Sequence, residues 1–285
     1  MSINTRQARP GDAAECGRIC YEAFGKLAAA HNFPADFPNA EIAASVISMF
    51  LGPPGMYGIV AEDNGRIAGS NFVDERGTIF GIGPITIDPS VQNQGIGTRL
   101  MQVAMARVNQ KGAAGVRLVQ AGYHCRSLAL YSKLGFEVRE QLCCLQGPAV
   151  GGNIVGYSVR SAGEQDVAAC NALAERIHGH HRGGELRDAI SHGTASVVVR
   201  SGRITGYASQ IAFFGHANAE TTDDIKALIM ATESYAGPGF LLPSSNGELL
   251  RWCLRKGLRI TQPMTLMTMG LYNEPAGAYL PSILY

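Results

Sequence analysis

The sequence contains no long apolar run and almost no excess of charge. No stretch approaches the ~20 apolar residues that a bilayer-spanning helix needs, and the first residues do not resemble a secretory signal peptide. The 24 Lys and Arg nearly balance the 23 Asp and Glu, giving a net charge of +1. No broad basic field would therefore attract a nucleic-acid backbone or an anionic membrane. We expect a cytoplasmic protein whose partner is a small molecule, with neither nucleic acid nor membrane as a ligand.

Cysteine pairs at metal-binding spacing are also missing. The seven cysteines are scattered, without the CxxC pairs of a structural zinc site, and their odd number is typical of reduced thiols. Four histidines gather in the second half of the chain but lack a helical i, i+4 pair joined to a carboxylate. We interpret them as a polar surface loop and predict no metal. They are His178, His180, His181 and His192.

A chain of 285 residues exceeds the usual size of one domain, so two domains are expected. A stretch of small residues at 147–153 predicts the boundary, with domains at 1–146 and 154–285. Three short patterns recur in the same order on both sides of it, which predicts a duplicated fold. They are Arg6-x-Ala-x-x-x-Asp12 against Arg160-x-Ala-x-x-x-Asp166, residues 65–69 against 202–206, and residues 134–136 against 256–258.

The first half alternates between helical and strand-like patterns. Asp12 can cap a helix to about Leu27, and Asn39 or Glu41 opens another that ends before Gly52. A meander of three strands, a long helix from Gly95 to about Gly112, and a strand, helix and strand then follow. This order predicts an α/β (α+β) lobe with a mixed, mostly antiparallel, twisted sheet flanked by helices. The predicted strands span residues 57–62, 66–74, 78–87, 116–120 and 136–145, and the last helix spans 127–134.

The segment from Ile85 to Leu100 is the most informative. A strand meets Pro89, turns, and begins a helix through Gly95 and Gly97. Glycine lets a main chain approach a ligand closely, and the free N–H groups of a first helical turn favour negative charge. The segment has neither the GxxxxGK pattern of a P-loop nor the third glycine of a dinucleotide fingerprint. We therefore predict a site for a diphosphate of another kind.

Two motifs carry a family resemblance. Gln92-x-x-Gly95-x-Gly97 resembles the coenzyme A loop of the GNAT superfamily of N-acetyltransferases. Leu130-Tyr131-x-Lys133-x-Gly135-Phe136 is similar to a second segment of that superfamily, and the order of elements is similar too. The resemblance covers residues 4 to about 145. It implies two GNAT-like lobes in tandem, of which the second is degenerate.

The resemblance implies acetyl-CoA as the co-substrate. Ile85 and Ile87 would then offer main-chain hydrogen bonds to the pantetheine arm, and the glycine loop would hold the diphosphate. Tyr131 would be the general acid that protonates the departing thiolate. The residues predicted to bind acetyl-CoA are Ile85, Thr86, Ile87, Gln92, Asn93, Gln94, Gly95, Ile96, Gly97, Thr98, Ser127 and Tyr131.

The general base stays open. His124 stands where the family usually has Asn, and Ser127 replaces a common Ala, so contacts with pantetheine can differ here. His124 can also remove the amine proton, because imidazole titrates near neutral pH. Glu75 is the preferred carboxylate candidate, with Asp74 and Glu62 as alternatives. Covalent catalysis through Cys125 lacks a supporting motif and is not favoured.

The second half repeats the pattern without the coenzyme loop. Acids at 219–225 cap a helix where the loop would align, and they would repel a diphosphate. Asn246 and Cys253 align with His124 and Tyr131. The apolar tail, 272–285, is expected to dock as a strand or to fold over the cleft.

These patterns predict an enzyme, an N-acetyltransferase that moves acetyl from acetyl-CoA to a primary amine of a small molecule in a ternary complex. It would be an acyltransferase without a metal and a possible homodimer. The alternatives are a non-catalytic acyl-CoA-binding sensor and acetylation of protein or peptide amines.

Overall fold

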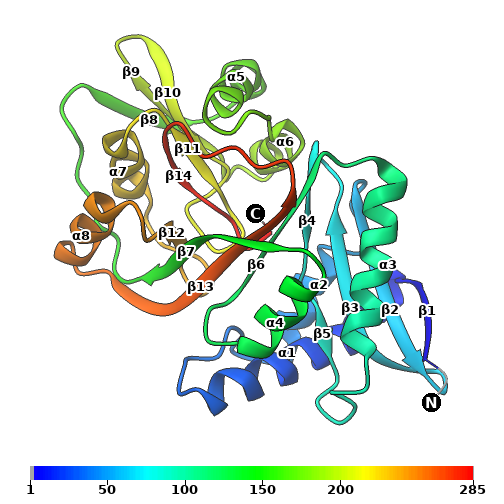
Figure 1. Cartoon of the computed structure of the whole chain (residues 1–285). Coiled ribbons are helices and arrows are strands. Elements are labelled where there is room, and N and C mark those ends of the chain that lie inside the picture. Colours follow the sequence, from blue (N-terminus) through cyan, green and yellow to red (C-terminus); the bar gives the residue numbers. More distant parts are fainter. Residues whose placement is uncertain (1–2, 285) are drawn as a thin grey trace. The chain divides into compact units, whose positions relative to one another are not determined.

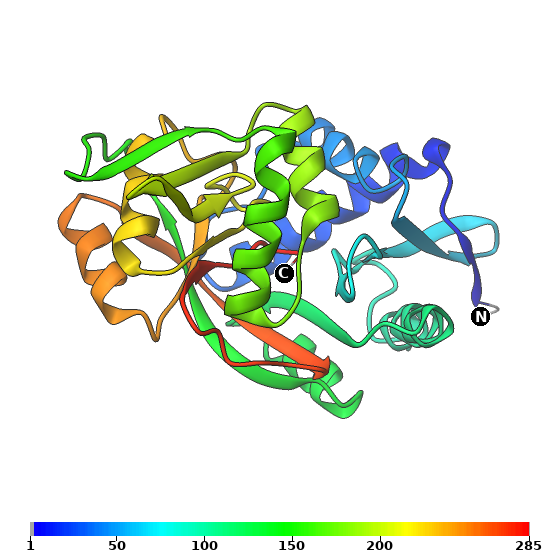
Figure 2. The same cartoon turned by 90° about the horizontal axis from the view of Figure 1, so that it is seen from above.

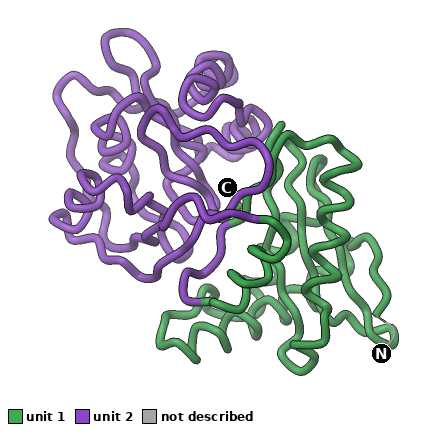
Figure 3. The backbone as a smooth tube through the Cα atoms, viewed as in Figure 1, with its two compact units in different colours: residues 1–118, 124–135, 284 green, residues 119–123, 136–283, 285 purple. Residues whose placement is uncertain are grey.

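The computed structural model describes residues 3–284. The chain forms two compact units (Figure 3): unit 1 comprises residues 1–118, 124–135 and 284, and unit 2 comprises 119–123, 136–283 and 285. Tyr285, the end of the tail considered above, lies outside the described residues. Among the described helices, none is both long and apolar enough to cross a membrane.

Unit 1 is built on an antiparallel meander. In order, β1 (Ile3–Gln7), β2 (Met56–Asp63), β3 (Arg66–Asp74) and β4 (Ile79–Ile82) are neighbours, and the start of β6 (Gly115–Ala121) runs parallel to β4. Asn64 and Gly65 join β2 to β3 with φ values of 50° and 78°, as a tight hairpin turn requires. The meander is confirmed. β1 was not expected, because its residues are mostly polar.

Helices cover both faces of this sheet (Figure 2). α1 (Ala13–Ala30) and α2 (Ala40–Ser48) lie on one face, and α3 (Ile96–Lys111) lies on the other. Asn39 caps α2 by accepting a 2.8 Å hydrogen bond from the Ile42 amide. A short helix, α4 (Cys125–Lys133), follows β6. All four helices predicted in this half are confirmed.

One predicted strand is divided in two. The pattern at 78–87 predicts a single strand, but β4 ends at Ile82 and a separate β5 (Thr86–Ile87) follows. Gly83 and Pro84 separate them, since proline has no N–H to donate to a ladder. β5 pairs only with β3, through Ser70–Thr86 and Gly69–Ile87. Among the described strands, none pairs with its other edge.

Unit 2 contains a five-stranded sheet in the order β14-β11-β10-β9-β8. α5 (Val167–His178) packs on one face together with α6 (Gly183–Ser191), and α7 (Thr222–Ala231) packs on the other (Figure 1). The tail docks as a strand, the first of the two expected alternatives. The strands are β8 (Tyr157–Ser161), β9 (Ser196–Arg200), β10 (Arg203–Ala208), β11 (Ala217–Ala219) and β14 (Ala278–Leu280).

A second set of strands in unit 2 joins the two sequence halves. β7 (Glu137–Gln146) lies between β12 (Phe240–Pro243) and β13 (Arg259–Gly270), antiparallel to both. Residues 147–153 contain no helix or strand, as the predicted boundary requires. The compact units nevertheless divide the chain elsewhere, because the last strand of the first half pairs with strands of the second. The domain boundary at 147–153 therefore stays a prediction from the sequence.

The predicted duplication is visible in local geometry. Arg6 binds Asp12 at 2.8 Å and Arg160 binds Asp166 at 2.7 Å, each carboxylate lying just before a long helix. α4 and α8 (Gly247–Arg255) both have nine residues. The residues that precede them, His124 and Asn246, have φ, ψ of −89°, 72° and −80°, 67°.

Candidate functional site

The loop between β5 and α3 is held by its own side chains. Asp88 accepts hydrogen bonds from the amide and the hydroxyl of Ser90, at 2.9 and 2.6 Å. Arg18 of α1 reaches the same carboxylate at 3.0 Å. The Gln92 side chain donates to the Ile87 carbonyl at 3.2 Å. These contacts fix the turn that leads into the helix.

α3 begins with an open N-terminus. Gly95 precedes it with φ of 82°, no side chain of the described residues caps it, and its first turn carries no acid. The N–H groups of Ile96, Gly97 and Thr98 therefore have no intrahelical partner and can bind an anion, with the helix dipole in support. A Cβ at position 97 would come 3.3 Å from Ile87, whereas Gly95 faces open space.

Arg126 adds a cation to this loop. Its guanidinium donates to Asn93 Oδ1 at 2.7 Å and to Gln92 Oε1 at 3.0 Å. Arg126 lies in the first turn of α4, more than thirty residues along the chain from its partners. The sequence motifs do not identify it, because no local spacing links an exposed arginine to a loop that far away.

The predicted pantetheine residues lie beside the loop. Thr86 and Ile87 form β5, and Ile85 directly precedes it. Gly69 allows β3 to approach this strand, since a Cβ there would collide with the Thr86 carbonyl. The unpaired edge of β5 can accept an extended, amide-containing ligand through main-chain hydrogen bonds.

Three predicted residues meet on α4. His124 directly precedes the helix, and Ser127 and Tyr131 follow at spacings of three and four residues, which places the three side chains on the same side of α4. Ser127 Oγ lies 2.6 Å from His124 Nδ1. The Tyr131 hydroxyl is hydrogen-bonded to Ser127, and the Tyr131 side chain is 5% exposed.

Burial sets the charge of this group. It raises the pKa of Tyr131 to about 12, against a smaller opposing effect of the Ser127 hydrogen bond. Burial also lowers the pKa of His124 to about 4, with further lowering by the charges of Arg126 and His31. Near neutral pH, Tyr131 is therefore protonated and His124 is uncharged.

The predicted carboxylates are all engaged elsewhere. Glu75 binds Arg107 at 2.5 Å and lines a cavity of about 330 Å³ beside Lys111. Arg107 and Lys111 belong to the last turns of α3, whose 16 residues span ~24 Å. Glu75 thus lies at the end of α3 opposite to the glycine loop. Asp74 pairs with Arg76, and Glu62 pairs with Arg6.

The prediction of a polar surface loop around the histidines is wrong for two of them. His178 and His180 are 6% and 7% exposed. His178 Nε2 lies 2.7 Å from Asn218 Oδ1, and its ring meets the Tyr279 ring edge-on at 5.2 Å. The end of α5 is buried because β11 and the docked tail pack against it. Within the described chain, no group of three or more potential ligands is arranged to hold a metal ion.

The position in unit 2 that corresponds to the glycine loop is closed. Gly206 of β10 pairs with Ala219 of β11 as Gly69 of β3 pairs with Ile87 of β5. The free edge seen at β5 is filled in β11, where β14 pairs with it. α7 begins at a capping box in which Thr221 and Asp224 bond each other's amides, and Asp223 adds a second acid.

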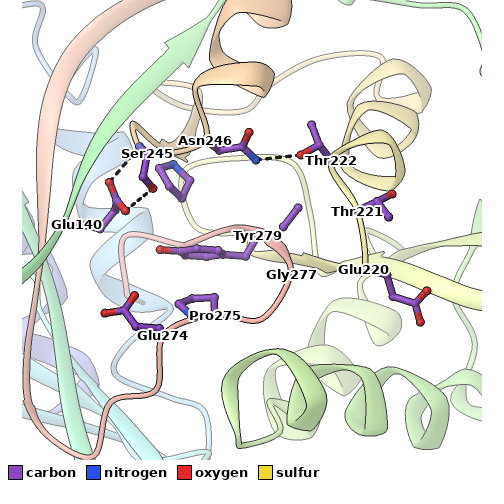
Figure 4. Close-up of a pocket in the computed structure, with 12 residues that line it drawn as sticks. Glu140, Glu220, Thr221, Thr222, Ser245, Asn246, Glu274, Pro275, Gly277 and Tyr279 are labelled. Carbon is purple, nitrogen blue, oxygen red and sulfur yellow. Dashed lines mark hydrogen bonds between the residues drawn. The ribbon is translucent and has the colours of Figure 1, made fainter.

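A cavity of about 510 Å³ in unit 2 lies beside these same elements (Figure 4). Its lining includes Glu140, Glu220 and Glu274, together with Tyr279 of β14. Glu140 accepts hydrogen bonds from Ser245. Glu220 is one of the acids that the sequence predicts to repel a diphosphate, and it is paired with Arg176, Arg200 and Arg203.

One family model matches a segment of the first sequence half. Residues 54–138 match the model of the acetyltransferase (GNAT) domain, a stretch that contains the glycine loop, α3 and α4. This segment of the chain is therefore similar to the GNAT domain. A GNAT fold supports acetyl transfer from acetyl-CoA. This reaction class agrees with the one that the sequence predicts. No curated protein sequence matches the chain significantly.

Solved structures share the GNAT fold over nearly the whole chain. A proposed acetyltransferase of Pyrococcus horikoshii is 16% identical with a TM-score of 0.73, covering 97% of this chain and 94% of that one. A GCN5-related N-acetyltransferase of Sphaerobacter thermophilus is 16% identical, with a TM-score of 0.60 and coverages of 95% and 96%.

A tandem GNAT protein from the clavulanic acid biosynthesis pathway is 12% identical, with a TM-score of 0.56 and coverages of 99% and 100%. At such identities the likeness shows the fold. Both halves of this chain therefore take the tandem GNAT arrangement that the sequence repeat predicts, and the predicted fold class is confirmed.

Proposed function

We propose that the chain transfers the acetyl group of acetyl-CoA to a primary amine of a small molecule, directly and within a ternary complex. The observation that carries this proposal is the uncapped N-terminus of α3 next to the unpaired edge of β5. A diphosphate joined to an amide-containing arm needs this pair of features, and the two lie in one segment, residues 85–98.

The chain's own groups hold the carrier in this proposal. The amides of Ile96, Gly97 and Thr98 donate to the diphosphate, and Arg126 adds positive charge beside it. The main chain of Ile85 and Ile87 offers hydrogen bonds to the pantetheine arm. The bound thioester supplies an activated acetyl group for attack by the amine.

Tyr131 is the proposed general acid for the departing thiolate. An alkyl ammonium, with a reference pKa of ~10.4, must first lose a proton. We propose that this proton leaves through water rather than to Glu75, because Arg107 holds that carboxylate at the far end of α3. His124 Nδ1 is occupied by Ser127, which disfavours it as the base.

The second domain, proposed as residues 154–285, supports the first without binding a carrier of its own. Its α7 carries the Thr221 cap and two first-turn acids, and its own strand β14 fills the edge of β11. Both features oppose the binding that α3 and β5 favour. We therefore assign catalysis to the domain proposed at 1–146.

The test introduces into the first turn of α3 an acidic residue like the one that blocks the N-terminus of α7. Thr98 is the third residue of α3, as Asp224 is of α7, so Thr98→Asp should abolish acetyl-CoA uptake in calorimetry. Thr98→Ser is the matched control and should bind like the wild type. Wild-type protein that takes up no acetyl-CoA would refute the carrier site.

Transfer itself is measured as thiol release with amino acids, polyamines and amino sugars as acceptors. Tyr131→Phe should bind acetyl-CoA and lose most of its transfer rate. Binding without transfer to any amine would favour an acyl-CoA sensor instead. Release only with peptides would favour acetylation of protein amines.

A further inference from the structure

The buried phenol of Tyr131 is a weak acid for its proposed task. Its pKa is about 12, whereas a model alkyl thiol has a pKa of ~8.5. Giving up its proton alone would leave a buried phenolate that is a stronger base than the thiolate it protonates. The step becomes favourable when a second proton reaches the phenol oxygen at the same time.

The groups that can deliver this proton are already in line. Ser127 is hydrogen-bonded to Tyr131, and its Oγ lies 2.6 Å from His124 Nδ1. His124 is only partly buried, so its other ring nitrogen can exchange protons with water. The three side chains run from the buried phenol toward solvent along one face of α4.

We propose that His124 and Ser127 form a proton relay that reprotonates Tyr131 as the thiolate leaves. The inference rests on the proposed function, because it requires Tyr131 to be the general acid. His124 and Ser127 are positioning residues in it, since they act through Tyr131 and not on the substrate.

The protons balance without a charged intermediate on the relay. Tyr131 gives its proton to the thiolate sulfur, Ser127 Oγ–H passes to the Tyr131 oxygen, and His124 Nδ1–H passes to Ser127. The proton that the attacking ammonium has released to water is delivered to His124 Nε2, so no hydroxide is left behind. The imidazole thus begins as the Nδ1–H tautomer, ends as the Nε2–H tautomer and remains neutral, in line with the pKa that burial, and to a smaller extent the charges of Arg126 and His31, lower.

Unit 2 supplies the comparison that separates a relay from a structural role. Asn246, the counterpart of His124, caps α8 by accepting a 3.1 Å hydrogen bond from the Leu249 amide. His124 makes no capping hydrogen bond to α4, and its Nδ1 faces Ser127 instead. The counterparts of Ser127 and Tyr131 are Leu249 and Cys253, which cannot pass a proton along the same path.

The experiment measures single-turnover thiol release in H₂O and D₂O for the full chain. Ser127→Ala should slow release about 100-fold, the lower end of the range for acid–base groups. It should also make the rate depend on the concentration of an acidic buffer. Ser127→Thr keeps a hydroxyl and should restore the rate.

His124→Asn is the matched second variant. The asparagine can cap α4 as Asn246 caps α8, so the helix should be retained while the release rate falls as in Ser127→Ala. Acetyl-CoA affinity, measured by calorimetry, should stay within about 3-fold for every relay variant, because general acid–base groups act on the reaction step.

Three results would overturn the relay. Wild-type release rates and isotope effects in Ser127→Ala and His124→Asn would exclude it. A change confined to acetyl-CoA affinity would make Ser127 a pantetheine contact only. Full activity of Tyr131→Phe would remove both the relay and the general acid, whereas loss in Tyr131→Phe alone would leave the proposed function intact.

Discussion

At the scale of single residues, Gly95 sets the direction of the amides that precede α3. Its φ of 82° costs an L-amino acid ~1–2 kcal/mol, and a Cβ there would meet no atom within 4 Å. Gly95→Ala should therefore lower stability by about that amount through backbone strain alone. It should also weaken acetyl-CoA binding if the loop relaxes.

Gly25, inside α1, is the matched control, because a Cβ there also meets nothing within 4 Å and its helical φ suits alanine. Gly25→Ala should raise the unfolding free energy by ~0.5–1 kcal/mol. Urea unfolding of both variants measures the difference. Equal effects of the two substitutions would show that the backbone conformation at Gly95 is unimportant.

His124 predicts a pH dependence of stability. Its folded pKa of about 4 lies below the ordinary value of ~6.5, so the unfolded chain binds a proton that the folded chain excludes. The unfolding free energy should fall as the pH drops from about 6.5 toward 4, and His124→Asn should flatten that slope. His181→Asn, at an exposed position, is the control. An unchanged slope in His124→Asn contradicts the assignment.

The sequence motifs predict residues of the candidate site only where those residues lie close together along the chain. Gln92, Gly95 and Gly97 form one turn, and the spacing of Ser127 and Tyr131 along α4 brings them together. Arg126 binds that turn from a distant segment, and the separation of Glu75 from it depends on the length of α3. Both follow from tertiary packing, which no spacing along the chain encodes.

At the scale of elements, the pattern of polar and apolar residues and the turn sequences predict most helices and strands of unit 1. The exceptions have physical causes. β1 is a mostly polar strand, so its residues do not alternate clearly. The single strand predicted at 78–87 is divided because Pro84 cannot donate to the ladder, and this division frees the edge of β5. The break thus matters for function although the pattern hides it.

Both sequence halves contain the same arginine–carboxylate ion pair, called the clamp here: Arg6 with Asp12 in the first and Arg160 with Asp166 in the second. Asp166 is almost buried, accepts two 2.7 Å hydrogen bonds from Arg160 and one of 2.9 Å from the Gly163 amide. Asp166→Asn should lower the unfolding free energy by ~1–3 kcal/mol, since hydrogen bonds to a charged group are lost. Glu233→Gln, on an exposed side chain, is the control and should change little.

The same clamp has a pH dependence of known sign. Arg160 is the main cause of the lowered pKa of Asp166, so the stabilisation is complete above the unfolded value of ~3.9. It is lost as the pH falls through the lower folded pKa. Acid unfolding of Asp166→Asn should therefore lack this part of the transition, and an identical acid profile in both proteins would contradict the clamp.

At the scale of the whole molecule, the two sequence halves are tied by β7. This strand belongs to the first half, yet its neighbours β12 and β13 belong to the second. Leu142, Cys144 and Leu145 on β7 are at most 1% exposed. The repeat identifies two lobes, but it cannot reveal which strands pair, because both halves encode similar strands.

The fragment 1–146 should therefore not fold into a soluble monomer. Without residues 147–285, both edges of β7 that pair with β12 and β13 are left open. The apolar segment 142–145 of this strand would then lie on open edges, which promotes aggregation. The complementary fragment, produced together with it, should restore a soluble complex that takes up acetyl-CoA, because cutting the irregular segment 147–153 removes no strand. Size-exclusion chromatography and calorimetry of the fragment, the pair and the intact chain measure this. A monomeric 1–146 that unfolds cooperatively would show that β7 does not need its partners, and the first domain would then be independent.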